Sequence, residues 1–275
     1  MSSFRRIKII IASTLSDELH HKSVYVLGAC AVLFVLMLRG CFEGDMVVNG
    51  QRVDGVTIGW HASMIAFHLI AGAGVVVGIL LGMRVLRREK TAGGTAAILA
   101  APVRRIEYLT GKVTGVWIVA YGLTFILHLT VYLIMLFQTG GRIVLFLPAS
   151  FLISLNILFT VVLVMLLSQL VPDIVAALTG GIVWIVGYFS DTIYMASQHE
   201  AMKSILRQMN RREQPLALWR VIWPKMTALQ YFAVARIKDV PFHMPGPVHP
   251  LVNVAAFLLL VSLLLWWQFS REEIR

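Results

Sequence analysis

The stretch RREKTAGGTAAILAAPVRRIEYLTGK, from Arg87 to Lys112, separates two of the most apolar runs of the chain. It carries charges near both ends and is rich in glycine and alanine between them. The run on either side reaches the length of about 20 apolar residues with which a helix crosses a hydrocarbon layer. The stretch is therefore predicted to connect two membrane-spanning helices. Its own role is either to bind phosphate or to present a surface to another protein.

The composition of the whole chain agrees with a membrane protein. Its 275 residues are 58% hydrophobic and 14% charged, with a mean hydropathy of +0.79. A soluble domain normally has about a quarter of charged residues. The net charge of +10 is interpreted as basic loops that face anionic lipid rather than as a surface for nucleic acid. Cys30 and Cys41 are spaced neither as a zinc site nor as an obvious disulfide.

Apolar runs predict an all-α integral membrane protein with six transmembrane helices in a single domain, residues 1–275. Residues 1–22 lack the pattern of a cleaved signal peptide. They are predicted to form an interfacial elbow helix, because their apolar residues form a stripe at helical spacing beside basic residues. The predicted spans cover residues of about 23–38, 60–83, 113–137, 143–171, 174–195 and 251–269.

The distribution of lysine and arginine predicts the orientation of the spans. Basic residues gather before the first span, in residues 84–112 and at the C-terminal end. The positive-inside rule then makes both termini cytoplasmic, in the plasma membrane or bacterial inner membrane, with 84–112 as a cytoplasmic loop. Residues 196–250 become an extended helical external segment although they too are basic. They form either a packed cap or a basic vestibule that attracts an anionic substrate.

A phosphate-binding loop of the form G-x-x-x-x-G-K-[ST] does not fit the end of the opening stretch. When the pattern is aligned on Gly111 and Lys112, Ile106 occupies the first glycine position and Val113 the hydroxyl position. No other nucleotide-binding pattern is found, so ATP is expected to be hydrolysed by another chain.

The residues TAAILAA predict a short helix that docks on a partner. These residues are uncharged helix formers. Gly93 and Gly94 are predicted to mark the start of the helix, with Thr95 as the cap of its first turn, and Pro102 to end it. Basic residues stand before the helix and after it, where they can fix the orientation of a partner.

The spacing of these residues resembles the cytoplasmic loop of ABC-2 type permeases, the membrane subunits of a class of ABC transporters. Gly93 follows Glu89 by four residues, Pro102-Val103 is followed by Arg104 and Arg105, and Gly111-Lys112 leads into the next span. Two positions depart from the usual pattern, since Gly94 stands where threonine is common and alanines replace an acid.

The resemblance implies a permease without catalytic residues, metal or cofactor of its own, since ATP and Mg belong to the partner. It implies a dimer with a second copy or a paralogue, contact with membrane lipids, two cytosolic ABC ATPase subunits and, more commonly, export. The residues that it assigns to ATPase coupling are Glu89, Gly93, Gly94, Thr95, Ile98, Pro102, Arg104, Arg105, Gly111 and Lys112.

Other polar and small residues within the spans leave alternatives open. Gly74, Gly78 and Gly82 repeat every four residues, which predicts close helix packing within the subunit or at a moving interface. His61, His68 and His128 suggest, as the runner-up, a haem-handling or redox protein. A membrane anchor without transport is a third possibility. Asn156 and Gln169 are expected to hydrogen-bond across helices, and Asp191 is expected to be solvated or hydrogen-bonded.

Overall fold

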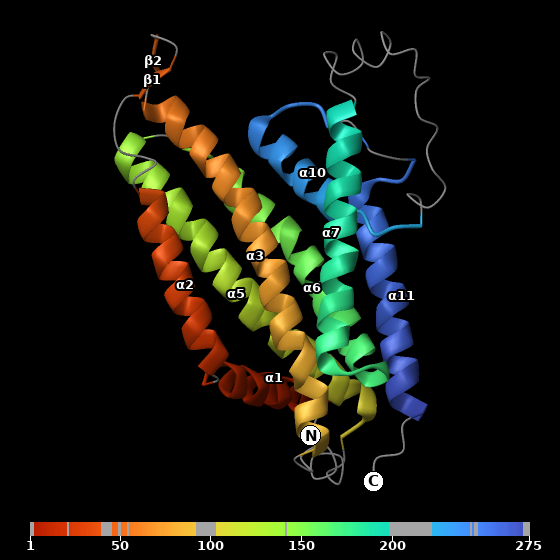
Figure 1. Cartoon of the computed structure of the whole chain (residues 1–275). Coiled ribbons are helices and arrows are strands. Elements are labelled where there is room, and N and C mark those ends of the chain that lie inside the picture. Colours follow the sequence, from red (N-terminus) through yellow and green to blue (C-terminus); the bar gives the residue numbers. More distant parts are fainter. Residues whose placement is uncertain are drawn as a thin grey trace.

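Long helices that run side by side make up most of the described chain, as Figure 1 shows. The computed structural model describes residues 3–20, 22–39, 46–48, 51–53, 55–91, 103–140, 142–197, 222–242, 244 and 247–271. In chain order, the elements are α1 (Ser3–Leu19), α2 (Lys22–Arg39), β1 (Met46–Val48), β2 (Gln51–Val53), α3 (Gly55–Thr91), α5 (Arg105–Thr139), α6 (Phe146–Leu170), α7 (Asp173–Ser197), α10 (Met226–Lys238) and α11 (Pro250–Arg271).

Five of these helices are long and apolar enough to cross a membrane, namely α3, α5, α6, α7 and α11. They coincide with the second to sixth predicted spans. The first predicted span falls on α2, which passes the same test only together with α1, and these two helices are bent by 67° to each other. The helical membrane architecture is therefore confirmed, whereas the six-span layout stays a prediction.

The helices extend further into the predicted 84–112 loop than the sequence suggested. Helix α3 continues to Thr91, and α5 begins at Arg105 rather than near residue 113. The charged residues at the start of α5 led to the prediction of a loop. In the structure Glu107 and Lys112 are buried, and Glu107 is bonded to Ser3 and Arg6 of α1, so charges at these positions do not prevent the helix.

A short hairpin departs from the predicted all-α class. Strands β1 and β2 are antiparallel, with Met46 opposite Val53 and Val48 opposite Gln51. The residues between them are Asn49 and Gly50, a dipeptide that favours tight hairpin turns. The sequence therefore carries a hairpin signal between the first two predicted spans.

Helix α6 lies at the centre of the bundle and packs against α3, α5, α7, α10 and α11. The glycines of α3 permit close contacts with two neighbouring helices, α5 at Gly74 and α6 at Gly78 and Gly82. A Cβ added at Gly74 would lie 2.5 Å from Oγ1 of Thr124, and one at Gly82 would lie 3.3 Å from the carbonyl oxygen of Val161. Gly78 likewise faces α6, so the three glycines pack within the chain.

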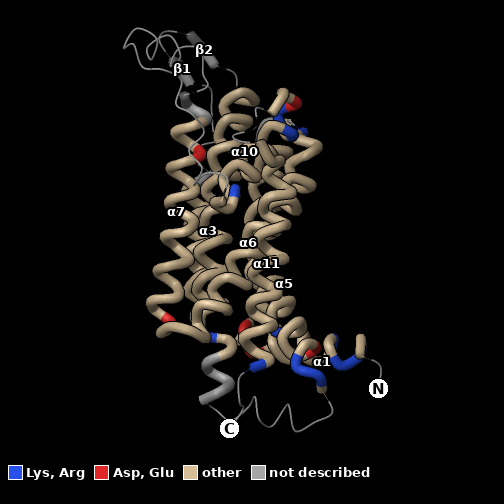
Figure 2. The backbone as a smooth tube through the Cα atoms, turned by 90° about the vertical axis from the view of Figure 1, so that its right-hand side faces the viewer, with Lys and Arg blue, Asp and Glu red and all other residues tan. Residues whose placement is uncertain are grey.

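The bundle has two ends with different contents. Helix α1, the first residues of α5 and the end of α11 lie at one end, called here the α1 end, and α10 and the hairpin lie near the other, the α10 end (Figure 1). In Figure 2 charged residues gather near both ends and are almost absent from the long middle. Such a distribution is that of a bundle whose middle lies in hydrocarbon.

Candidate functional site

The predicted coupling residues that the structure describes lie at the α1 end, where α1, α5 and α11 meet. Helix α1 crosses the first turns of α5, and the last turn of α11 reaches the start of the same helix. Residues 92–102, the predicted docking helix, join α3 to this junction.

Glu107 fastens α1 to α5. Its carboxylate is 3% exposed and accepts a hydrogen bond from Nη2 of Arg6 at 2.8 Å, which is also an ion pair. The same oxygen accepts the hydroxyl of Ser3, and the second oxygen accepts the backbone N–H of Arg104 at 3.0 Å. The carboxylate thus satisfies one of the free N–H groups at the start of α5 and also holds α1 in place.

Arg105 joins the start of α5 to the end of α11. Its Nη1 donates to the carbonyl oxygens of Phe269 at 3.3 Å and Ser270 at 2.7 Å. These carbonyls belong to the last turn of α11, where they lack partners within the helix and where a cation is favoured. One turn further along α5, the ring of Tyr108 stacks on that of Phe269, with centroids 5.7 Å apart.

Gly111 and Gly115 provide the surface on which α1 rests. A Cβ added at Gly111 would lie 2.6 Å from Cγ2 of Ile10, and one added at Gly115 would lie 2.7 Å from Cβ of Thr14. Both distances are too short for real atoms, so the two helices approach this closely only because the positions are glycine. The G-x-x-x-G spacing was visible in the sequence, but it did not indicate the partner helix.

The remaining predicted coupling residues divide into two groups. Lys112 is 2% exposed, and its Nζ lies 5.9 Å from the ring centroid of Tyr108, so it takes part in the packing of this junction. Glu89 lies in the last turns of α3, and nothing is described of its side chain. Gly93, Gly94, Thr95, Ile98 and Pro102 lie outside the described residues.

A second polar cluster, at the α10 end, was not predicted as a unit. Nζ of Lys225 lies 3.0 Å from Oδ1 of Asp191 in α7, and both side chains are buried. The other carboxylate oxygen accepts the N–H of Ala228 at 3.1 Å. The side-chain oxygen of Asn253 in α11 accepts the N–H of Lys225 at 2.8 Å, and Nδ2 of Asn156 in α6 donates to the carbonyl of Met226 at 2.7 Å.

This cluster ties the start of α10 to three spans. Asn156 bonds across helices, as expected, and of the two alternatives for Asp191 the structure shows the hydrogen-bonded one. It also shows that at least one of the basic residues of 196–250, Lys225, is neutralised inside the bundle rather than lining a vestibule. For Gln169, by contrast, no hydrogen-bond partner is found within the described part of the chain.

The histidines of the runner-up hypothesis are not gathered around a common site. Both ring nitrogens of His128 have protein partners, the hydroxyl of Ser150 at 2.8 Å and the carbonyl of Phe67 at 3.3 Å. Its ring also stacks on Phe67. His61 is exposed beside Trp60, and His68 lies against Tyr231. Over the described ranges, no group of three histidine, cysteine or acidic residues is arranged to hold a metal ion.

The fold and these contacts define an integral membrane protein whose polar side chains join helices to one another. A comparison with known protein families matches residues 15–273 to the family described as ABC-2 family transporter protein. The match covers nearly the whole chain, so the protein belongs to this family. A comparison with curated proteins gives no match.

Proposed function

We propose that this chain is the permease subunit of an ATP-driven ABC exporter. It forms the substrate path as a dimer with a second copy or a paralogue, in the plasma membrane or bacterial inner membrane, with its termini cytoplasmic. A separate cytosolic ABC ATPase carries the ATP and Mg, docks on residues 84–112 and supplies the motion. Family membership supports the class of transporter, and the junction at the α1 end supports the coupling.

The junction around the start of α5 is the observation that carries the proposal. Residues 92–102 lead directly into Arg104 and Arg105, and these residues contact α1 and α11 through Glu107 and the last carbonyls of α11. A displacement of residues 92–102 would therefore move α1, α5 and α11 together rather than α5 alone. Because α1 and α5 are closely packed at Gly111 and Gly115, they can shift little relative to each other.

Co-purification tests the proposal at its simplest level. The tagged full-length chain, expressed together with the ABC ATPase encoded beside it, is expected to retain that ATPase through a membrane extraction. Reconstituted together, the two chains are expected to move substrate only when ATP is supplied. Transport by this chain alone, in the absence of ATP, would contradict the proposal.

Reversing the charge of Arg104 and Arg105 is expected to uncouple ATP hydrolysis from transport while the chain still inserts into the membrane. Arg104 is exposed, so Arg104→Glu alone changes mainly the surface that faces a partner. Arg105→Glu in addition removes the donors to Phe269 and Ser270. Ile98→Pro, which breaks the predicted docking helix, is expected to give the same uncoupling. The measurement is the ratio of transported substrate to ATP hydrolysed in proteoliposomes.

The matched control for the charge reversals at Arg104 and Arg105 is Arg236→Glu, which changes an exposed arginine at the α10 end. The control is expected to keep the ratio of the unmodified protein. An unchanged ratio in both the Arg104→Glu and the Ile98→Pro variants would show that residues 84–112 do not transmit the motion.

A further inference from the structure

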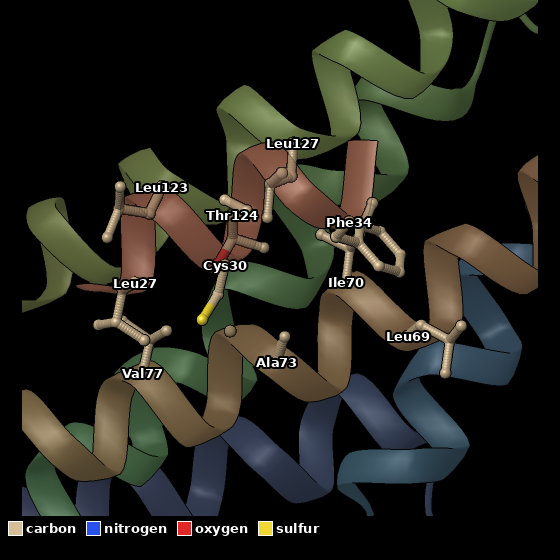
Figure 3. Close-up of a pocket in the computed structure, with 12 residues that line it drawn as sticks. Leu27, Cys30, Phe34, Leu69, Ile70, Ala73, Val77, Leu123, Thr124 and Leu127 are labelled. Carbon is tan, nitrogen blue, oxygen red and sulfur yellow. The ribbon is translucent and has the colours of Figure 1, made fainter. Parts of the chain in front are cut away.

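A cavity of about 280 Å³ lies between α2, α3 and α5. In Figure 3, Leu27, Cys30 and Phe34 of α2 point toward α3, with Val77 and Ile70 opposite them. Two alanines are among the lining residues, Ala31 from α2 and Ala73 from α3, and their short side chains fill little of the space between the helices.

The lining offers almost nothing to a polar molecule. No charged residue lines the cavity, and its hydroxyl group, that of Thr124, already donates to the carbonyl of Ala120 at 2.8 Å. A bound water needs two to four polar partners, whereas apolar cavities of about 150 Å³ stay dry and bind apolar molecules. A polar ligand would leave its own groups without hydrogen bonds. The chemistry of the lining therefore selects a hydrocarbon.

The position of the cavity indicates where the hydrocarbon comes from. Its lining residues on α3 run from Leu69 to Val77, in the middle of a helix that spans Gly55–Thr91. The cavity is also not sealed, because Cys30 is exposed and Leu69 is 55% exposed. An opening at this depth of a spanning helix faces the interior of the bilayer, where lipid acyl chains are the abundant molecules.

We propose that the cavity between α2, α3 and α5 binds one acyl chain of a membrane phospholipid. The acyl chain fills the gap between α2 and the rest of the bundle, supplying the contacts that the short side chains of Ala31 and Ala73 do not make. Atoms that line a void lose their attractive contacts on that side, and a hydrocarbon chain restores them. This inference concerns binding alone and does not depend on the transport function or on an ATPase.

Photolabelling with a phospholipid that carries a diazirine in the middle of one acyl chain tests the site. The full-length protein is reconstituted in nanodiscs of phosphatidylethanolamine and phosphatidylglycerol with a small fraction of the probe, without ATPase or substrate. Labelled residues are located by mass spectrometry. We expect the cavity residues of α2 and α3 to be labelled several-fold more strongly than the exposed face of α7, whose residues do not line this cavity.

Filling the cavity provides the matched comparison. Ala73→Phe places a ring in the hollow, and labelling of the cavity residues is expected to fall about tenfold, the factor that corresponds to losing the burial of roughly two methylene groups. Ala31→Phe fills the same space from α2. If one of the two variants does not fold, the other still tests the site. Ile182→Phe on the exposed face of α7 is the control and is expected to leave cavity labelling unchanged.

Two results would overturn the proposal. One is labelling of the cavity residues in the unmodified protein that is no stronger than labelling of α7. This is also the result expected if the cavity admits only a transported apolar molecule or a side chain of a second copy. The other is cavity labelling that is equally strong in correctly folded Ala73→Phe and Ala31→Phe proteins.

Discussion

Asp191→Ala is expected to release α10 from the bundle and to lower stability by about 3–5 kcal/mol, the cost of leaving a buried charge without its partner. The side chain of Lys225 is 6% exposed and would lose the carboxylate that lies 3.0 Å from its Nζ. The N–H of Ala228, in the first turn of α10, would lose its acceptor at the same time. The measurement is the thermal unfolding midpoint in detergent, together with hydrogen exchange of the amides in α10.

Removing both charges separates the ion pair from the other contacts. Asp191→Asn with Lys225→Met is expected to recover most of the loss, because an uncharged pair of similar size is often as stable as a buried ion pair and asparagine keeps an acceptor for Ala228. Asp17→Ala removes an exposed acid from α1 and is expected to change stability by no more than about 0.5 kcal/mol. Equal losses in the single and double variants would mean that the pair is not what holds α10.

The sequence predicted the spans because a bilayer imposes a strong requirement. A spanning segment must satisfy its backbone internally and present about 20 apolar residues, and both properties are local. Family membership was readable for a similar reason, since Glu89, Gly93, Pro102 and Gly111 lie at fixed spacings within one short segment. The predicted start of the span near residue 113 was wrong. Charged residues near Arg105 indicate a loop when only the sequence is known, because the groups that bind them in the folded chain cannot be read from it.

The partners of these charged residues are distant in the sequence, so no local pattern predicts the pairs. Arg6 and Glu107 are separated by 101 positions, and Asp191 and Lys225 by 34. Each pairing depends on how α1 or α10 folds back onto the spans. The same holds for the cavity, whose lining is assembled from residues of α2, α3 and α5.

Gly111→Ala is expected to loosen α1 from α5 without affecting membrane insertion. The new Cβ would lie 2.6 Å from Cγ2 and 2.8 Å from Cβ of Ile10, so one of the two helices must move. Overpacking of this kind costs about 1–3 kcal/mol, which outweighs the gain of up to about 1 kcal/mol from replacing a helical glycine by alanine. Amide exchange in α1 should therefore become about tenfold faster. If α1 takes part in coupling, ATP-driven transport should fall as well.

Gly122 of the same helix supplies the control. A Cβ added there meets no atom within 4 Å, so Gly122→Ala should keep the propensity gain without the clash and leave exchange in α1 unchanged. Gly115→Ala should behave like Gly111→Ala, because its Cβ would lie 2.7 Å from Cβ of Thr14. Combining Gly111→Ala with Ile10→Ala removes the closer of the two contacts and should restore part of the protection. If Gly111→Ala and Gly122→Ala have the same effect on α1, the close approach at Gly111 does not hold α1 on α5.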